Sequence, residues 1–398
     1  MSQATLFILV GAFSVCALTA CAGVPADRSS PETASDALKD YFASNDRSDW
    51  PTAPASVDWP SEQVLTRIAV GSCRSQESVA PILDALLERE PDLFLYIGDN
   101  VYGDVWSLSA DMEELLQAYA ELSDQNDFQR LASAVPILAT WDDHDFGMND
   151  GGGSYYGKYG SEAIFETYWG MRGHPVADRD GIYYSQMFGP AGRRVQIIML
   201  DTRFFRTDLT RTPNRNAPGM ERYIPSEAPG QDMLGPEQWL WLESELQKPA
   251  DLRLLVSSVQ VLADAHGWEA WKQLPLSQSR LYELLEASGA SGVILVSGDR
   301  HLSALYREEG LVDYPLYEMT ASSLNRPVRD ESDEMSSNQL GEAYAKENFG
   351  EIAIDWDRRM VVLSVHDSEG EKVREQAISF DEIGVEPGAS PGRSARQD

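Results

Sequence analysis

The sequence predicts an α/β protein in which helices cover mixed β-sheets. Short apolar runs that fit buried strands alternate with segments whose apolar residues recur at helical spacing, and strand-like runs become more frequent in the last third. Six of the strand-like runs end directly in a polar group. Because ligands of open α/β sheets bind beyond the carboxyl ends of the strands, we expect these six ends to form one site.

The predicted elements follow one another along the core. Ile82, Leu83 and Leu86 recur at helical spacing, which predicts a helix over residues 78–89. Pro236 suits the first turn of a helix that runs to residue 246. The other predicted helices cover residues 110–122, 128–132, 161–171 and 277–286. The predicted strands cover residues 66–71, 92–97, 136–140, 182–188, 194–200, 252–259, 292–296, 314–319, 351–355 and 360–365.

The composition limits the partners that the protein can bind. With 398 residues, 42% of them hydrophobic, the chain can bury a large core, either in one large α/β domain or in two or three domains. Its formal net charge is −32 at pH 7. This charge repels the phosphate backbone of nucleic acids, so we expect no nucleic-acid binding.

The N-terminus predicts export. The apolar run from Leu6 to Leu18 is short for a membrane span and has the place of a signal-peptide core. It ends in Leu18-Thr19-Ala20-Cys21, which resembles the lipobox of bacterial lipoproteins and implies lipidation of Cys21. The first five residues contain no Lys or Arg, which departs from that pattern, and an uncleaved N-terminal anchor is the alternative. We therefore expect a membrane-anchored lipoprotein of the bacterial cell envelope.

These features divide the chain into four parts. Residues 1–20 are the expected lipoprotein signal peptide, and residues 21–63 are an expected linker, rich in Ala, Ser, Pro, Asp and Thr, with room for a brief helix over 38–42. The catalytic domain is expected over residues 64–384 and a disordered tail over 385–398. If Cys16 is removed and Cys21 carries lipid, Cys73 has no disulfide partner.

An acidic stretch follows the predicted strand 136–140. It contains Asp142, Asp143, His144 and Asp145 within four consecutive positions. Carboxylates this close raise one another's pKa and oppose folding, so we expect a bound cation. Hard cations prefer carboxylate oxygens, and a histidine adds a nitrogen ligand or a proton-transfer group. The alternative is a solvated acidic turn with a helix cap.

Two other strand ends carry further candidate ligands. Gly98-Asp99 turns the chain sharply and presents a carboxylate that is able to bridge two ions, although this dipeptide is also common in ordinary turns. Tyr102 lies on the same loop and is either a phenolate ligand or part of the core. Cys73 is either an inert buried thiol or a thiolate ligand, which favours iron or zinc over calcium.

Two pairs of residues at i and i+2 complete the candidate site. Asp299 and His301 face the same way if their segment is extended, which favours metal ligation or a phosphate contact. Asp201 and Arg203 have the same spacing, which suits an aspartate that holds an arginine toward an anion; a surface ion pair is the alternative.

The best general-acid candidate is His144, oriented by Asp145, because the pKa of a histidine lies near neutrality. Residues 152–158 have the spacing of a P-loop, but Tyr159 replaces the required Ser or Thr, so we expect a flexible aromatic lip over the site instead. No Gly-x-Ser-x-Gly elbow and no His-Glu-x-x-His sequence occurs, so the serine hydrolase and zincin classes lack support.

As an ordered set, these motifs resemble the alkaline phosphatase D-like branch of the calcineurin-type metallophosphoesterases. The series is Gly-Ser-Cys, Gly-Asp-x-x-Tyr, Trp-Asp-Asp-His-Asp, Leu-Asp-x-Arg and Ser-Gly-Asp-x-His, over residues 66–365. The resemblance implies an αββα sandwich of two mixed β-sheets, with iron and calcium as cofactors and other divalent metals as alternatives. It implies the metal ligands Cys73, Asp99, Tyr102, Asp142, Asp143 and Asp299 and the catalytic residues His144, Arg203 and His301.

The resemblance also implies the reaction. We expect a phosphomonoesterase or phosphodiesterase in which a metal-activated hydroxide attacks phosphorus, metal ions neutralise the developing charge and His144 protonates the leaving group. Two alternatives stay open: a phospholipase D-like phosphodiesterase that acts on lipid headgroups, and a metal-binding envelope lipoprotein without catalytic activity. Longer family members carry an N-terminal β-sandwich domain, for which residues 22–60 have neither the length nor the strand pattern. The oligomeric state does not follow from the sequence.

Overall fold

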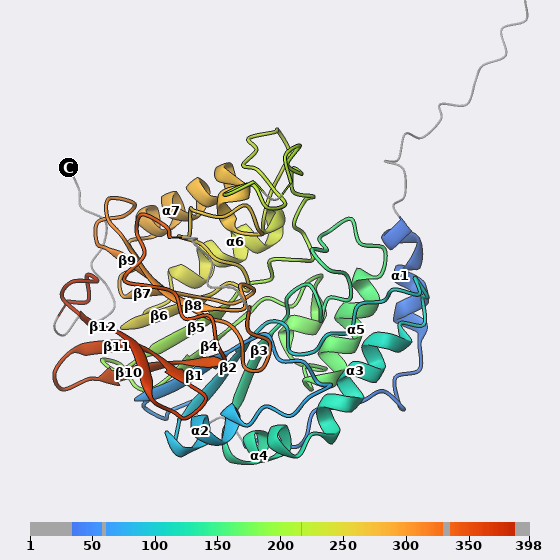
Figure 1. Ribbon diagram of the computed structural model, residues 1–398, viewed down its shortest axis with the longest axis horizontal. Coiled ribbons are helices and arrows are strands. Elements are labelled where there is room, and N and C mark those ends of the chain that lie inside the picture. Colours follow the sequence, from blue (N-terminus) through green and yellow to red (C-terminus); the bar gives the residue numbers. More distant parts are fainter. Residues whose placement is uncertain (1–33, 58–60, 216, 329–334, 387–398) are drawn as a thin grey trace, which may run out of the picture.

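The fold is built from two stacked β-sheets with helices on both outer faces (Figure 1). The computed structural model describes residues 34–57, 61–215, 217–328 and 335–386. In this part of the chain, each sheet has six strands. The predicted αββα sandwich of mixed sheets is therefore confirmed.

The first sheet has the strand order β12-β11-β10-β1-β2-β3, and the second has the order β4-β5-β6-β7-β9-β8. The strands are β1 (Arg67–Gly71), β2 (Leu93–Ile97), β3 (Ile137–Thr140), β4 (Tyr184–Phe188), β5 (Val195–Met199), β6 (Leu252–Val256), β7 (Val293–Ser297), β8 (Ser303–Glu308), β9 (Leu316–Ala321), β10 (Asn348–Asp355), β11 (Met360–Asp367) and β12 (Lys372–Ser379). The α-helices are α1 (Ala34–Ser44), α2 (Ile82–Glu88), α3 (Glu113–Asp124), α4 (Asn126–Ala134), α5 (Lys158–Tyr168), α6 (Gly235–Leu246) and α7 (Pro275–Ser288).

The central strands are apolar on both faces because both faces are buried. In β2, Leu93 and Leu95 join the core between the two sheets, whereas Phe94 and Tyr96 point into the core under the helices of the first sheet. Side chains alternate across a strand, so a strand that is covered on both sides must be apolar throughout. This explains why these strands are continuous apolar runs in the sequence.

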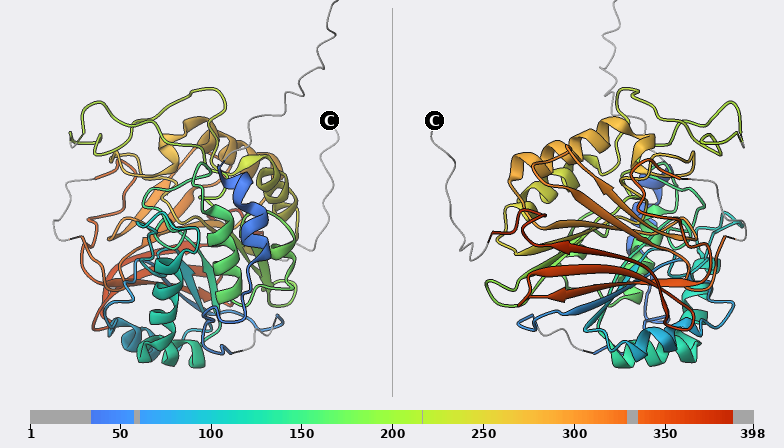
Figure 2. Two further views of the ribbon diagram at one scale, coloured as in Figure 1. Left: turned by 90° about the vertical axis from the view of Figure 1, so that its right-hand side faces the viewer. Right: turned by 60° about the vertical axis from the view of Figure 1, so that its left-hand side comes forward.

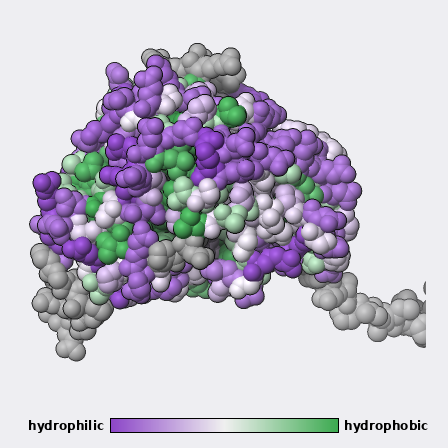
Figure 3. Space-filling view, turned by 90° about the horizontal axis from the view of Figure 1, so that it is seen from below, coloured by the Kyte–Doolittle hydropathy of each residue, from purple (hydrophilic) through white to green (hydrophobic). Residues whose placement is uncertain are grey.

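The helices form the two outer layers. Helices α2 to α5 pack on the first sheet through one core cluster, and α6 and α7 pack on the second sheet through another. Trp239 of α6 and Leu281 of α7 are both buried there. On the face drawn in Figure 3, hydrophilic residues predominate and the hydrophobic ones lie in separate small groups, as the acidic composition suggests.

The strand directions bring the candidate residues together. Strands β1, β2 and β3 are mutually parallel, and so are β5, β6, β7 and β9. Parallel strands end at the same edge of a sheet, so the loops that follow them share one side of the molecule. The mixed character comes from the antiparallel strands β10, β11 and β12 of the first sheet and β4 and β8 of the second.

The predicted linker needs correction where α1 lies. This helix packs against α5, as the left view of Figure 2 shows, and its Phe42 is buried in the core. Farther along, the backbone N–H of Ala53 donates to the carbonyl of Tyr168 at 2.8 Å. Residues 34–53 are thus part of the folded domain. The few apolar side chains of this segment are enough to pack it against the surface of α5.

Two strands and one loop also differ from the sequence-based expectations. Strands β8 and β12 were not predicted. The exposed edge strand β12 carries mostly polar residues, so its sequence lacks the alternation of apolar and polar residues that identifies a strand. The expected aromatic lip is wrong: Tyr155 and Tyr159 are buried in the core, and the ring of Tyr155 lies 5.4 Å from that of Phe146.

The ends of the chain lie outside the described residues. This applies to the expected signal peptide, to Cys21 and to residues 387–398 of the expected tail. Val385, the first residue of that tail, is buried, and its N–H donates to the carbonyl of Phe380 at 2.8 Å. Among the described helices, none combines the length and the apolar character that crossing a bilayer requires.

Candidate metal centre and active site

The loops after the parallel strands meet at the predicted site. Cys73 follows β1, Asp99 follows β2, the stretch from Asp142 to Asp145 follows β3, and Asp299 and His301 follow β7. The backbone N–H of Cys73 donates to the carbonyl of Gly98, which joins the first two loops directly. The expected meeting of the strand ends is therefore confirmed for these four loops.

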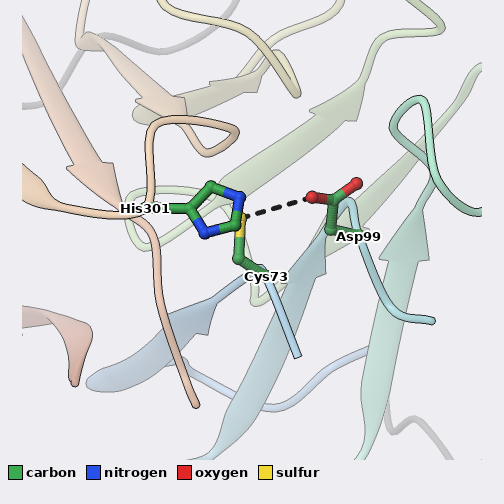
Figure 4. A group of neighbouring side chains, drawn as sticks. All are labelled: Cys73, Asp99 and His301. Carbon is green, nitrogen blue, oxygen red and sulfur yellow. Dashed lines mark hydrogen bonds between the residues drawn. The ribbon is translucent and has the colours of Figure 1, made fainter. Parts of the chain in front are cut away.

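Cys73, Asp99 and His301 form the first group of potential ligands (Figure 4). One ligand atom from each lies within 4.8 Å of the others. The Cys73 Sγ and the Asp99 Oδ2 are 3.5 Å apart, and both side chains are buried. Three different loops thus present a sulfur, an oxygen and a nitrogen toward one point.

Two more groups overlap with the first. Asp99, Asp143 and His144 form one, and Asp142, Asp143 and Asp299 form the other, each again within 4.8 Å. Asp99 and Asp143 each belong to more than one group. This arrangement suits carboxylates that bridge neighbouring cations, as the sequence predicted for Asp99.

The backbone at these positions is left-handed. The φ angles are 54° at Cys73, 50° at Asp99, 66° at Asp299 and 57° at His301. Such conformations cost non-glycine residues about 1–2 kcal/mol each and cluster at functional sites, where surrounding contacts hold them. The extended segment that we expected around Asp299 and His301 is therefore wrong, and the two side chains belong to different groups.

The hydrogen bonds of His301 define its tautomer. Its Nδ1 contacts the backbone carbonyl of Arg326, which can only accept, so Nδ1 carries the proton. The lone pair of Nε2 then points to the site, where the phenol oxygen of Tyr102 lies 3.4 Å away. A backbone carbonyl is a usual partner for the other nitrogen of a metal-binding histidine. Burial lowers the pKa of His301 to about 4, so the ring is neutral at pH 7.

The carboxylates lack sufficient partners of their own. Within the described part of the chain, the Asp142 Oδ2 and Asp143 Oδ1 atoms are buried without a hydrogen-bond partner. Burial and the neighbouring carboxylates raise the pKa of Asp99 and of Asp299 well above the usual range. A cation between these oxygens would relieve both the desolvation and the repulsion.

The donor atoms fit two kinds of metal ion. Burial, together with the Asp99 carboxylate, raises the pKa of the Cys73 thiol and of the Tyr102 phenol, so only a bound cation would hold either as an anion. The phenol oxygen of Tyr102 lies 3.0 Å from the Asp99 Oδ2. A sulfur and nitrogen group fits iron or zinc, whereas the oxygen-only group fits a hard ion such as calcium.

His144 has a different orienting partner from the one predicted. Its Nδ1 lies 2.6 Å from the Oδ2 of Asp104, which leaves Nε2 available. Asp145 is instead buried and accepts the backbone N–H groups of Asn100 and Asp142 at 2.9 Å each. Although burial lowers the pKa of His144, nearby carboxylates, with Asp143 the strongest, raise it to about 11.

Arg203 is buried and faces carboxylates. Its Nε donates to the Asp142 Oδ1 at 2.6 Å, and its Nη1 donates to Glu269 at 2.7 Å. Asp201, its expected partner, accepts the backbone N–H of Arg203 rather than its guanidinium. The prediction that Asp201 aims this guanidinium at an anion is therefore wrong, because stronger acceptors surround it.

The sequence did not reveal all members of the site. Asp104 orients His144, Glu269 pairs with two buried arginines, and the Ser322 Oγ lies 2.9 Å from the Cys73 Sγ. Asp150 and Glu269 also form a further acidic group with Asp143. Ser322 directly follows β9. The polar residues after this strand could therefore have indicated that a seventh strand end, besides the six predicted, reaches the site.

The chain matches known proteins in both sequence and fold. A family model described as PhoD-like phosphatase matches residues 68–364. No curated protein matches the chain significantly. PhoD itself has a similar structure, with a TM-score of 0.61 and 15% identity over 82% of this chain and 73% of that chain.

Two further solved structures share the fold. The purple acid phosphatase PPD1 from seeds of yellow lupin (Lupinus luteus) has a TM-score of 0.57 and 12% identity, and the match covers 85% of this chain and 58% of that one. GAP50, described as the anchor in the inner membrane complex of Plasmodium, has a TM-score of 0.53 and 13% identity, over 83% and 93%. The family model covers most of the sandwich and its strand-end loops, and the chain belongs to the PhoD-like phosphatase family.

Proposed function

We propose that this phosphoester hydrolase depends on bound metal ions, with iron and calcium as the best candidates. The observation that carries the proposal is the set of overlapping ligand groups, whose buried oxygens on Asp142 and Asp143 have no hydrogen-bond partner among the described residues. Cys73, Asp99, Tyr102 and His301 would hold the softer ion. When bound, metal ions supply Lewis-acid polarisation of a phosphoryl oxygen and lower the pKa of a coordinated water.

His144 is the proposed proton donor to the leaving group. Asp104 accepts from its Nδ1 at 2.6 Å, so Nε2 faces the site in a fixed direction. Burial lowers the pKa of His144, whereas Asp104, which is not a proposed metal ligand, raises it through its hydrogen bond and its charge; this favours the protonated form that a general acid needs.

Arg203 positions a ligand in this proposal. It and Ser258, whose Oγ donates at 2.5 Å, both bind the Oδ1 of Asp142, which leaves Oδ2 for a cation. We therefore assign Arg203 a supporting role and not the substrate contact that the sequence predicted.

Lipid phosphodiesters are a second candidate substrate class. On the loop that carries Asp104, Trp106 is 71% exposed and Leu108 is 63% exposed. Exposed apolar side chains beside an active site suit contact with acyl chains or headgroups. A binding protein without activity is a weaker alternative: GAP50 is described as an anchor and shares the fold, so the fold alone does not imply catalysis.

We also propose that the protein is exported and attached to the membrane of the cell envelope through lipid on Cys21. The apolar run 6–18 and the lipobox-like residues 18–21 support this. Mass spectrometry of the envelope-associated protein tests it: a diacylated Cys21 terminus is expected, and an unmodified Met1 terminus would reject it.

The proposed activity is tested with a nitrophenyl phosphate monoester and the corresponding bis-ester. The full chain should hydrolyse at least one of them, and a chelator should abolish this turnover. Asp99→Asn should lower kcat by at least about 100-fold, because it removes a charged oxygen that more than one ligand group shares. Asp357→Asn is the matched control, since Asp357 is exposed and pairs with Arg193. Full turnover by Asp99→Asn or in the chelated protein would reject the proposal.

A further inference from the structure

Arg326 is an exposed cation beside the proposed metal centre. Its guanidinium carbon lies 4.0 Å from the centre of the Tyr102 ring. The oxygen of the same tyrosine contacts Asp99 at 3.0 Å, and its ring lies 4.2 Å from the ring of His144. A single aromatic side chain thus connects Arg326 with a proposed metal ligand and with the proposed proton donor.

The backbone around Arg326 is fixed on the ligand loops. The side-chain amide of Asn325 accepts the N–H of Ser75 at 2.7 Å and donates to the Ser75 carbonyl at 2.9 Å. The carbonyl of Arg326 accepts from the Nδ1 of His301, and the N–H of Val328 donates to the carbonyl of His301 at 2.9 Å. The position of Arg326 relative to the site is therefore set before any substrate binds.

Within the described ranges, the charge of Arg326 is not paired with a carboxylate. Two other arginines near the acidic groups face carboxylates: Arg203 pairs with Asp142, and Arg206 pairs with Glu269. Among the described residues, the guanidinium of Arg326 has no ion-pair partner, and its contact is with the face of Tyr102. Stacking on a ring face leaves the edge of a guanidinium, which carries its N–H donors, available to another group.

We propose that Arg326 binds the additional charged oxygen that distinguishes a phosphate monoester from a diester. This inference rests on the proposed function and names its substrate class. Near neutral pH a monoester carries a charge of about −1.5 to −2, whereas a diester carries about −1. A guanidinium matches the geometry of phosphate oxygens, and Arg326 provides one in a chain whose formal net charge is −32. Arg326 is thus a specificity-determining residue that favours monoesters.

The test compares Arg326→Gln with the unaltered full chain on nitrophenyl phosphate and its bis-ester. A charge-assisted hydrogen bond is worth about 1.5–3 kcal/mol, so kcat/KM for the monoester should fall about 10- to 100-fold. The value for the bis-ester should change less than about twofold, because that substrate lacks the second charge. Arg280→Gln is the matched control: Arg280 is also exposed, and its guanidinium lies 4.5 Å from the ring of Trp239.

Two results would overturn the inference: no loss on the monoester, or equal losses on both esters with unchanged metal content and Tm. If Arg326→Gln loses metal or stability, Arg326→Lys decides, since it keeps the charge and should retain more monoester activity than Arg326→Gln relative to the bis-ester. If Arg326→Lys and Arg326→Gln have the same ratio of monoester to bis-ester activity, the inference is again overturned.

Failure of the proposed function would be recognised separately. If the unaltered protein hydrolyses neither ester, calorimetry with methyl phosphate and dimethyl phosphate on the metal-supplemented chain still tests Arg326. Weaker binding of methyl phosphate alone by Arg326→Gln would support the inference, and equal binding by both proteins would overturn it.

Discussion

The two oxygens of Asp142 have different roles. Oδ1 accepts from Arg203 at 2.6 Å and from Ser258 at 2.5 Å, while Oδ2 has no hydrogen-bond partner in the described part of the chain. A buried carboxylate oxygen without a partner is costly unless a cation binds it. At the scale of single residues, the site therefore contains carboxylates whose oxygens receive only part of their hydrogen bonds from the described residues.

The pairing of Asp104 with His144 leads to a prediction about leaving groups. Asp104→Ala should lower kcat about 10- to 100-fold with little change in KM, because the imidazole loses the acceptor that orients it. The loss should be larger for phenyl phosphate than for nitrophenyl phosphate, since a poorer leaving group needs protonation more. Steady-state kinetics on the two esters measures this.

A structural role for Asp104 would give a different result. An equal loss on both esters would show that the variant damages the site without affecting proton donation, and it would contradict the assignment of His144.

Some site residues follow from the sequence and others do not. Cys73, Asp99 and Asp142 stand directly after apolar runs, so the ends of the strands predict their meeting. Asp104 and Glu269 lie within loops, and only the folded path of those loops brings them to His144 and Arg203. Local pattern does not encode such contacts, which is why Asp145 and Asp201 were given the wrong partners.

At the scale of elements, helix α1 extends the folded domain toward the N-terminus. Phe42 is 2% exposed and packs where α5 has Gly160, whose missing Cβ would come within 2.6 Å of the phenyl ring. The few apolar residues in this segment predicted only a brief helix over 38–42 within a linker, and not the packing of α1 on the domain. Leu38 packs against the same core, and Lys39 forms an ion pair with Asp180, so a few contacts attach this largely polar helix.

This packing predicts a loss of stability on truncation of the side chain. Phe42→Ala should lower the free energy of unfolding by about 3–5 kcal/mol, as large-to-small changes in well-packed cores do. Thermal or urea unfolding measures the change. Asp40→Ala on the exposed side of the same helix should have little effect, and equal stabilities of the two variants would contradict the packing of α1 on α5.

The raised pKa of Glu166, in α5, should make the stability of the fold depend on pH. Burial, assisted by Asp178 and opposed by Arg47 and Arg172, raises its pKa from 4.5 to about 7. The folded state then holds a proton that the unfolded state releases, so this favourable contribution is complete below about pH 4.5 and is lost as the pH rises through 7.

The measurement compares the native protein with Glu166→Gln, which cannot ionise. Between pH 4.5 and 7, the native protein should lose on the order of 2 kcal/mol relative to the variant, after allowance for solvent screening. A difference between the two unfolding free energies that stays constant with pH would contradict the raised pKa.

The elements also show which patterns a sequence encodes best. Strands such as β2 and β7, buried on both faces, were predicted to within one residue at each end, because burial demands continuous apolar residues. Strand β12 was missed, because it is an edge strand with mostly polar residues and its neighbours supply the pairing.

At the scale of the whole molecule, the sandwich gathers the ends of seven parallel strands from two sheets at one place. The family and the layered fold were predictable because the motifs occur in a fixed order along the chain. The same fold occurs in phosphatases and in the anchor GAP50, so the activity depends on the side chains at the strand ends. In the proposed function, this activity depends on cations bound by these side chains.

The most direct test is to measure metal content and phosphoester turnover together as metal is removed from the purified chain and then restored. Turnover is expected to fall in proportion to the loss of metal and to return with iron and calcium, whereas turnover by Asp99→Asn should stay low at every metal concentration. Undiminished turnover by protein shown by elemental analysis to be free of metal would contradict this expectation.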